Sequence, residues 1–330
     1  MRPTSVSRRP VWAAVGGLAC FLVSATVAAS GPTFGQSLQD SGTQAPLHGV
    51  FFHDARNGWA VGDGGTILRT SDGGRHWETV AIRTRALLTA VQFADAQTGW
   101  VVGLQGIILH TSDGGKTWSR QFSGTQAGLF GTHFVTPSIG WVVGSGGTIL
   151  RTGDGGARWQ DQDSGTSTAL YAVYSVEPDR ATAVGALGTI VSTEDAGKTW
   201  RKQETQSAAT LFDVFFNDAS HGWAIGNVGA MFQTIDGGDR WIDRTLPCIG
   251  LCAKPLDLLG IRFTSREVGW IVGERGVIYR TTDSGFNWIQ QTSKSPASLF
   301  GLSFAGPGQG WASGERGTIL HISTSDKEKD

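Results

Sequence analysis

A short pattern recurs seven times along this 330-residue chain at nearly constant spacing. Its clearest copy is Gly99-Trp100-Val101-Val102-Gly103, and the last glycines of the seven copies are 41, 41, 41, 41, 47 and 41 residues apart. These glycines are Gly62, Gly103, Gly144, Gly185, Gly226, Gly273 and Gly314. A period of this length is typical of architectures in which each repeat is one small structural unit that buries its apolar face against its neighbours. The repeat therefore decides the fold class.

Each period contains four short segments typical of β-strands. In the second repeat they are residues 88–93, 99–103 and 107–111 and a segment that begins near Trp118, and turn-forming residues separate them. Four antiparallel strands per repeat are typical of a propeller blade, and seven such blades close into a ring. The sequence predicts an all-β protein, a seven-bladed β-propeller.

The seventh repeat lacks an outer strand of its own, and the residues before the first repeat supply one. Residues 40–43 (Asp-Ser-Gly-Thr) match residues 163–166 at an offset of 123 residues, which is three periods of 41. Residues 34–39 therefore have the position of an outer strand, and we expect them to complete blade 7 so that no sheet edge stays open. We place the propeller at residues 30–324 and a charged tail at residues 325–330.

A second recurring element follows six of the repeats, and Thr111 to Trp118 (T-x-D-x-G-x-T-W) is its clearest copy. An aspartate in a tight turn accepts backbone hydrogen bonds, and the glycine after it permits positive φ. Because the six aspartates fall on six different blades, we predict a structural role for them rather than catalysis or Ca²⁺ binding. They are Asp72, Asp113, Asp154, Asp195, Asp236 and Asp283. Twelve of the 13 tryptophans, all except Trp12, lie in the two recurring elements, where we expect them to form the core.

The first 29 residues differ in character from the repeats. Arg8 and Arg9 precede an uncharged run from Val11 to Ala29, and this pattern predicts an export signal cleaved near Ala29. An uncleaved membrane anchor, a twin-arginine signal and lipidation at Cys20 are the alternatives. Each of them places the remaining chain outside the cytoplasm, in the periplasm or the extracellular space.

Cys248 and Cys252 are the cysteines of the mature chain, and they lie in the one insertion that lengthens a repeat interval from 41 to 47 residues. In an exported protein, two cysteines so close together predict a local disulfide. A metal site is the weaker alternative, because the nearby sequence has no histidine to complete a ligand set.

The charge balance argues against a nucleic-acid partner, since residues 30–330 carry 24 basic and 28 acidic side chains. One sector is nevertheless basic. Arg83 and Arg85 follow blade 1, while Arg275 and Arg316 lie in turns of blades 6 and 7, and blades 6, 7 and 1 are consecutive in a closed ring. This sector is either solvated surface with local Glu–Arg pairing or a docking patch for a protein partner.

The first strand of each blade is expected to line the central tunnel. One column of positions reads Gly49, Ala90, Gly131, Ala172, Asp213, Gly260 and Gly301, and a second reads Phe51, Gln92, His133, Tyr174, Phe215, Arg262 and Ser303. Neither column has the pair of carboxylates that a glycosidase needs, and no Ser-His-Asp arrangement follows from the spacings. We therefore predict no catalytic residue, no metal and no cofactor.

The combined pattern G-W-x-V-G-x-x-G-x-I-L-x-T-x-D-G-G-x-x-W, which Gly99 to Trp118 carries almost letter for letter, resembles the photosystem II stability/assembly factor family of Asp-box (bacterial neuraminidase repeat) propellers. The resemblance extends over residues 34–324. It implies a non-enzymatic propeller in the periplasm or the thylakoid lumen that assists assembly of the photosystem II reaction centre. It also implies an arginine-rich docking surface, although no local motif transfers the family's arginines to numbered positions here.

We therefore expect an exported monomer that binds a membrane protein or membrane complex, and photosystem II itself if the host is phototrophic. A carbohydrate- or cell-wall-binding propeller and an Asp-box glycosidase are the alternatives. A sialidase would need an arginine triad and a tyrosine nucleophile, and the chain has only Tyr171, Tyr174 and Tyr279.

Overall fold

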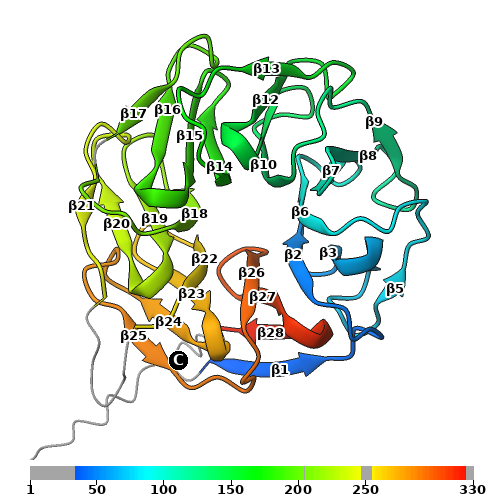
Figure 1. Ribbon diagram of the computed structural model, residues 1–330. Helices are drawn as coiled ribbons and strands as arrows, with labels where there is room; N and C mark the ends of the chain where they lie inside the picture. Colours follow the sequence, from blue (N-terminus) through cyan, green and yellow to red (C-terminus); the bar gives the residue numbers. More distant parts are fainter. Residues whose placement is uncertain (1–33, 204, 247–254, 325–330) are drawn as a thin grey trace, which may run out of the picture. The chain divides into compact units, whose positions relative to one another are not determined.

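Seven four-stranded antiparallel sheets stand around a central axis in the computed structural model of the protein, which describes residues 34–203, 205–246 and 255–324 (Figure 1). The predicted seven-bladed all-β propeller is thus confirmed. The predicted export signal, Cys248, Cys252 and the charged tail lie outside the described residues. In the described part of the chain, no helix has the length and apolar character needed to cross a membrane.

The blades follow one another in chain order. Blade 1 consists of β2 (Leu47–Phe52), β3 (Gly58–Gly62), β4 (Ile67–Thr70) and β5 (Glu78–Thr79). Blade 2 consists of β6 (Leu88–Phe93), β7 (Gly99–Gly103), β8 (Ile107–Thr111) and β9 (Ser119–Gln121). Blade 3 consists of β10 (Leu129–Phe134), β11 (Gly140–Gly144), β12 (Ile149–Thr152) and β13 (Gln160–Gln162). Blade 4 consists of β14 (Leu170–Glu177), β15 (Arg180–Gly185), β16 (Ile190–Thr193) and β17 (Arg201–Gln203).

The remaining blades repeat the pattern with small variations. Blade 5 consists of β18 (Leu211–Phe216), β19 (Gly222–Gly226), β20 (Met231–Thr234) and β21 (Ile242–Asp243). Blade 6 consists of β22 (Leu258–Phe263), β23 (Gly269–Gly273), β24 (Ile278–Thr281) and β25 (Ile289–Gln291). Blade 7 consists of β26 (Leu299–Phe304), β27 (Gln309–Gly314), β28 (Ile319–Ser323) and β1 (Gly35–Gln39). Short 3₁₀ turns join the second and third strands of six blades, namely η1 (Asp63–Gly65), η2 (Ser145–Gly147), η3 (Ala186–Gly188), η4 (Asn227–Gly229), η5 (Glu274–Gly276) and η6 (Glu315–Gly317).

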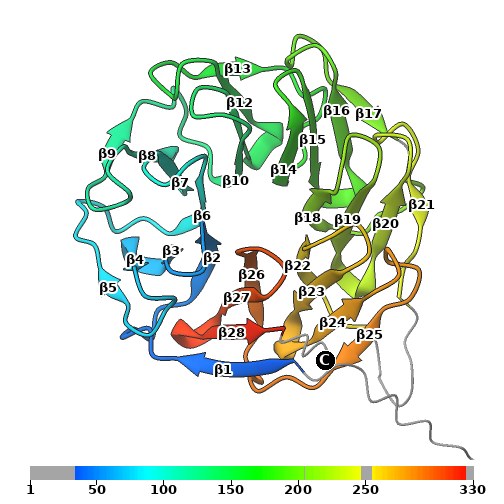
Figure 2. The same cartoon turned by 180° about the vertical axis from the view of Figure 1, so that it is seen from behind.

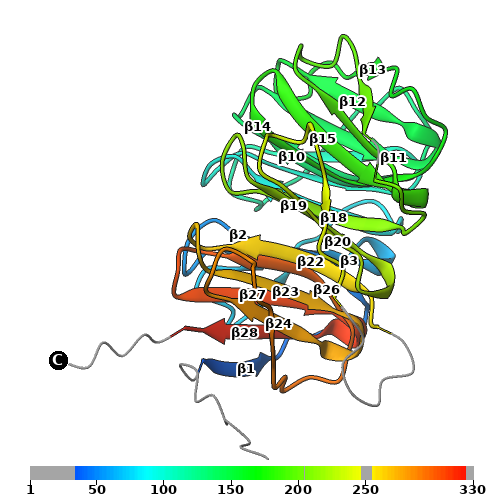
Figure 3. The same cartoon turned by 90° about the vertical axis from the view of Figure 1, so that its left-hand side faces the viewer.

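The ring closes between the two ends of the propeller, as the sequence predicted for residues 34–39. Strand β1 pairs antiparallel with β28 from Gly35 opposite Ser323 to Gln39 opposite Ile319. Figures 2 and 3 show β1 as the outermost strand beside β28. Strand β1 therefore covers the edge of β28, which would otherwise be unpaired.

Tryptophans of the second strands fill the seams between blades. Trp59 is 1% exposed and stacks on Phe93 of the next blade at 3.6 Å, and Trp100 is fully buried against Phe134 at 3.4 Å. A buried tryptophan removes about 150–250 Å² from water, which favours folding by about 4–6 kcal/mol before the entropy cost. Because these indole rings contact the next blade, they link neighbouring blades at six of the seven seams, the exception being the seam between blades 4 and 5.

The six predicted aspartates lie in the turns between the third and fourth strands. In blade 2, Asp113 Oδ1 accepts hydrogen bonds from the Thr111 hydroxyl at 2.7 Å and the Thr117 amide at 3.0 Å. Partial desolvation raises the pKa of Asp113, but the hydrogen bonds from Thr117 outweigh it and lower that pKa to about 2. The same contacts from the preceding threonine and from the amide four residues on recur at Asp72, Asp154, Asp195, Asp236 and Asp283.

Candidate binding site at the mouth of the channel

A β-bulge recurs at the start of the innermost strand in every blade. In β2, Leu47 pairs with Gly62 and Gly49 with Val61, so that His48 has no partner of its own across the sheet. The same shift occurs in all seven innermost strands. A bulge redirects the side chain of the extra residue. The seven bulged residues, which we call the collar, all line the central channel: His48, Thr89, Phe130, Tyr171, Phe212, Leu259 and Phe300.

The collar is mainly aromatic, and its members contact one another from blade to blade. The ring centroids of Phe130 and Tyr171 are 5.3 Å apart, and those of Tyr171 and Phe212 are 5.8 Å apart. His48 stacks on Phe300 at 5.3 Å, and its Nε2 lies 2.8 Å from Asp63 Oδ1 in η1. All seven side chains are half-buried. The channel thus presents an apolar, aromatic surface near the end of the ring where the 3₁₀ turns lie.

Below the collar, polar side chains bind the backbone of the neighbouring blade. The Gln92 amide group donates to the Phe134 carbonyl at 3.1 Å and accepts from the Phe134 amide at 2.6 Å. Ser303 Oγ accepts from the Phe52 amide at 2.9 Å, which joins blade 7 to blade 1. These residues belong to the second column that the sequence assigned to the tunnel, and here they hold blades together at the axis.

Asp213 and Arg262 form an ion pair between blades 5 and 6. Oδ2 of Asp213 lies 2.7 Å from Nη1 of Arg262 and also accepts the Ile261 amide at 3.0 Å. Both side chains line the channel, and the carboxylate is 14% exposed. Among the described residues that line the channel, Asp213 is the one carboxylate. Its contacts are those of a paired, structural acid.

His133 lies in the same layer beside Tyr174, with ring centroids 4.2 Å apart. Its Nδ1 accepts the Ser175 amide at 3.2 Å. Burial, and secondarily the positive charge of Arg262, lower the pKa of His133 to about 3. The imidazole is therefore neutral at ordinary pH and serves as a hydrogen-bond acceptor between blades 3 and 4.

The tips of the turns between the second and third strands lie at the same end of the ring as the collar. The amide of Asp63 in η1, for example, donates to the Pro46 carbonyl, two residues before His48. Residues at these tips have positive φ, including Leu187 at 56°, Val228 at 53°, Arg275 at 55° and Arg316 at 54°. Leu187 is 66% exposed and Val228 is 46% exposed. This end of the propeller therefore carries apolar tips on blades 4 and 5 and basic tips on blades 6 and 7.

The structure places all four predicted partner-binding arginines at this end. Arg275 and Arg316 are the tips of η5 and η6, and Arg83 and Arg85 are exposed in the loop that leads from β5 to β6. Arg275 Nε lies 3.5 Å from Glu274 in its own turn. In the described residues, no recorded contact joins the four arginines to one another, so they form a sector over three consecutive blades rather than a cluster.

The collar was not predicted from the sequence. Strict alternation along a strand predicts that the columns that begin with Gly49 and Phe51 line the tunnel and that the residues between them do not. A bulge adds one residue and brings the neighbouring column to the channel as well. The sequence did contain a signal, since His48, Phe130, Tyr171, Phe212 and Phe300 repeat at one position of the period. In the described residues, no group of three or more His, Cys, Asp and Glu side chains has the arrangement of a metal site.

Comparison with known proteins identifies the family. The sequence matches the family described as "Photosynthesis system II assembly factor YCF48" over residues 36–127, 122–206 and 199–292. The structure is similar to "YCF48 bound to D1 peptide", with a TM-score of 0.73, 23% identity and coverage of 89% of this chain and 96% of the other. It is also similar to YCF48 from Cyanidioschyzon merolae, with a TM-score of 0.73, 21% identity and coverage of 88% and 99%.

The same fold also occurs in enzymes. A streptogramin B lyase aligns with a TM-score of 0.75 at 12% identity and covers 88% of this chain and 97% of its own. No curated protein sequence matches the chain. Structural similarity at this level of identity shows the fold alone, whereas the family match spans most of the propeller. The chain belongs to the photosynthesis system II assembly factor YCF48 family.

Proposed function

We propose that this protein is an exported, non-catalytic assembly or stability factor that binds a segment of a membrane protein at the collar end of the propeller. The observation that carries the proposal is the aromatic collar, which seven bulges place at the mouth of the channel in a chain of the YCF48 family. Half-buried aromatic rings at an open mouth are suited to receive apolar side chains of a bound polypeptide.

The surroundings of the collar favour a polypeptide as the ligand. Leu187 and Val228 extend the apolar surface outward on one side, and Arg275 and Arg316 supply positive charge on the other. Interfaces typically combine an apolar centre with a polar rim that guides association. A YCF48 structure with this fold holds a D1 peptide, so a D1-type segment is the partner we propose for a phototrophic host.

Two further parts of the proposal come from the sequence. The basic and apolar pattern of residues 1–29 supports export to the periplasm or, in a phototroph, the thylakoid lumen. Non-catalytic action is supported by the channel chemistry, because the Asp213 carboxylate in the lining is engaged by Arg262 and the Ile261 amide. Most glycosidases hydrolyse their substrates with a pair of carboxyl groups, which the described channel lining does not supply.

A titration of a fluorescently labelled D1 peptide tests the proposal. The Phe212→Ala substitution removes a collar ring and should weaken binding by about tenfold or more, as expected for an aromatic residue at the centre of an interface. Phe286→Ala is the matched control, because Phe286 is 74% exposed and lies in the turn between β24 and β25, at the end of the ring opposite the collar. Equal affinity of the two variants for the peptide would show that the collar is not part of the binding site. Saturable binding of a cell-wall glycan with no peptide binding would favour the carbohydrate-binding alternative.

A further inference from the structure

Six of the seven seams between blades contain a tryptophan from a second strand, and the seam between blades 4 and 5 does not. The six tryptophans are at most 1% exposed, and they are Trp59, Trp100, Trp141, Trp223, Trp270 and Trp311. Thr182 on β15 has the corresponding position in blade 4. Its side chain is far smaller than an indole ring, so this seam lacks the ring that the other six contain.

The filled seams show what holds the indole. Trp100 stacks on Phe134 with ring centroids 3.4 Å apart and donates its Nε1 hydrogen to the Gly155 carbonyl at 3.3 Å. Two other seams repeat this arrangement with Trp59, Phe93 and Gly114, and with Trp311, Phe52 and Gly73. Each such slot therefore has an aromatic face and a carbonyl acceptor.

Both of these features remain in the seam that lacks tryptophan. Phe216 ends β18 as Phe134 ends β10, and Gly237 corresponds to Gly155 two repeats earlier. In the described part of the chain, no recorded hydrogen bond reaches the Gly237 carbonyl. The face and the acceptor of an indole slot are thus present without the indole.

A second observation at the same seam concerns Gln203 and Trp241. At three other seams a glutamine donates to the corresponding carbonyl and accepts a hydrogen bond from the tryptophan of the Asp-bearing turn, and these glutamines are Gln39, Gln121 and Gln162. Gln203 instead donates to Ser192 Oγ at 2.9 Å. Trp241 is 8% exposed, and its Nε1, like those of Trp118 and Trp288 in the equivalent turns, has no partner among the described residues. A buried donor without a partner is costly in a protein interior.

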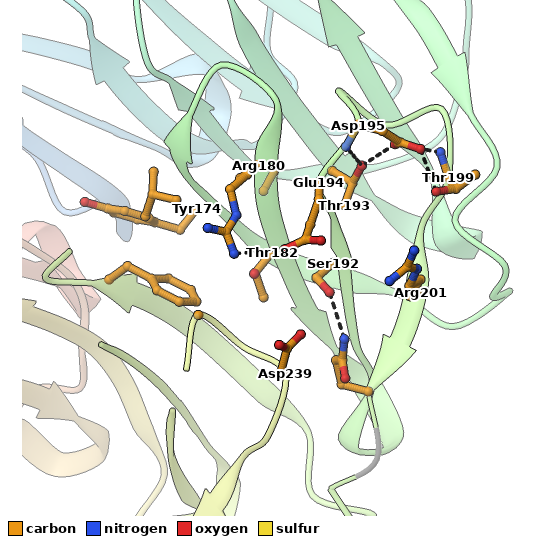
Figure 4. A pocket seen from close by; sticks show the side chains of 15 residues that line it. Tyr174, Arg180, Thr182, Ser192, Thr193, Glu194, Asp195, Thr199, Arg201 and Asp239 are labelled. Carbon is orange, nitrogen blue, oxygen red and sulfur yellow. Dashed lines mark hydrogen bonds and ion pairs between the residues drawn. The ribbon is translucent and has the colours of Figure 1, made fainter. Parts of the chain in front are cut away.

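The pocket at this seam has a volume of about 90 Å³, and Figure 4 shows its lining. Since one water molecule needs about 10–15 Å³ on this measure, the pocket has room for a small organic group. Tyr174 and Phe216 supply its aromatic walls. Arg180 also lines the pocket, where its guanidinium lies next to Gly237 and its Nη2 is 2.9 Å from Glu194 Oε1, and the side chains of Arg180 and Glu194 are 30% and 58% exposed. A guanidinium beside an aromatic slot also favours an aromatic ligand through cation–π attraction.

We propose that the slot between blades 4 and 5 binds an indole-type ligand, a flat aromatic ring that stacks on Phe216 and donates an N–H to the Gly237 carbonyl. The ligand chemistry is that of the six indoles that the protein itself places at the equivalent seams. Its source is either a free indole compound or the tryptophan side chain of a polypeptide. The slot lies in a seam between blades and does not depend on the function proposed for the collar.

Ligand-observed ¹⁹F NMR of 5-fluoroindole with the full-length protein tests the proposal, and N-acetyltryptophanamide serves as the competing peptide-like probe. We expect saturable line broadening with the unaltered protein. Thr182→Trp fills the slot and should abolish the broadening. Thr79→Trp is the matched control, because it adds a tryptophan at an exposed position of β5 and should leave binding unchanged. If N-acetyltryptophanamide displaces fluoroindole, the slot accepts the tryptophan side chain of a polypeptide. If it does not, the slot accepts free indole compounds.

A second variant covers the case in which Thr182→Trp fails to fold. Phe216→Leu keeps an apolar wall but removes the stacking face, and it should weaken binding about 2- to 10-fold. Broadening that is equal in the unaltered protein, Thr182→Trp and Phe216→Leu would overturn the proposal, as would the absence of saturable broadening in the unaltered protein.

Discussion

Asp213 Oδ2 lies 2.7 Å from Arg262 Nη1 in the channel, where the pair joins the innermost strands of blades 5 and 6. The same oxygen accepts the Ile261 amide at 3.0 Å, and the Arg262 guanidinium lies 5.9 Å from the centre of the Phe215 ring. The one acid of the described channel lining is therefore part of the ring's own structure.

Replacing Asp213 with alanine should destabilise the propeller. The change leaves the Arg262 cation and the Ile261 amide without their partner, which typically costs about 2–4 kcal/mol for a largely buried pair. Urea unfolding followed by tryptophan fluorescence measures the loss. Asp161→Ala on β13 is the control, since Asp161 is exposed and should give a change within about 0.5 kcal/mol. Equal stability of the two variants would show that the pair contributes little.

Removing residues 34–40 should lower the melting temperature, because it exposes the edge of β28. Strand β1 pairs with β28 over five residue positions, and each net backbone hydrogen bond is worth about 0.5–1.5 kcal/mol. We expect a melting temperature lower by about 5–15 °C, with aggregation through the open edge. Leu38→Ala controls for the lost side chain, because Leu38 is 57% exposed and its backbone pairing survives the change. Unchanged melting of the deletion variant would contradict closure by β1.

Lowering the pH should reduce the free energy of unfolding before the carboxylates are protonated, because His133 is buried in its neutral form. Its pKa is about 3 in the folded protein, whereas the unfolded value is about 6.5. A folded pKa that is depressed means that protonation favours the unfolded chain, so stability is lost as the pH falls from about 6.5 toward 3. One such histidine contributes about 1–2 kcal/mol of loss between pH 7 and pH 5.

The matching variant is His133→Gln, which keeps an acceptor for the Ser175 amide but has no titrating ring. Urea unfolding at pH 7 and pH 5 should show a smaller loss of stability in this variant than in the unaltered protein. Some pH dependence should remain, since burial also lowers the pKa of His110 and His321. An equal loss in both proteins would show that His133 is not responsible.

The basic sector should accelerate association with a partner. Exchanging its four arginines for glutamate should lower the association rate constant by about tenfold at low salt, and the difference should shrink as ionic strength rises. The residues are Arg83, Arg85, Arg275 and Arg316. Stopped-flow mixing with labelled D1 peptide measures the rate. Arg56→Glu with Arg266→Glu is the control, because both arginines are exposed in turns between first and second strands, at the other end of the ring. Equal rates for the two variants would exclude steering by the basic sector.

The architecture was predictable because the repeat determines both the number of blades and the position of the strand that closes the ring. The spacing of Gly62 to Gly314 gave the number of blades, and the match between residues 40–43 and 163–166 located the closing strand. These features depend on period and hydrogen-bond closure, which a sequence displays directly.

The candidate sites were less predictable, because they depend on departures from the repeat. The collar arises from a bulge at His48 and its six counterparts, which no simple alternation predicts. The threonine at position 182, where the six other repeats have tryptophan, can be read from the sequence, but the contacts of Trp241 Nε1 and of the Gln203 side chain follow from the three-dimensional structure alone. The four arginines were placed on the correct turns, since those turns are fixed by the strands around them.

The central claim is that the collar end of the propeller binds a membrane protein, and site-specific photocrosslinking in host membranes tests it most directly. A photoreactive phenylalanine analogue at position 212 lies in the collar, and the same analogue at position 286 lies in the turn between β24 and β25, at the opposite end of the ring. We predict an adduct with an integral membrane protein from position 212, competed by D1 peptide, and none from position 286. Adducts of equal yield from both positions, or none from position 212, would contradict the claim.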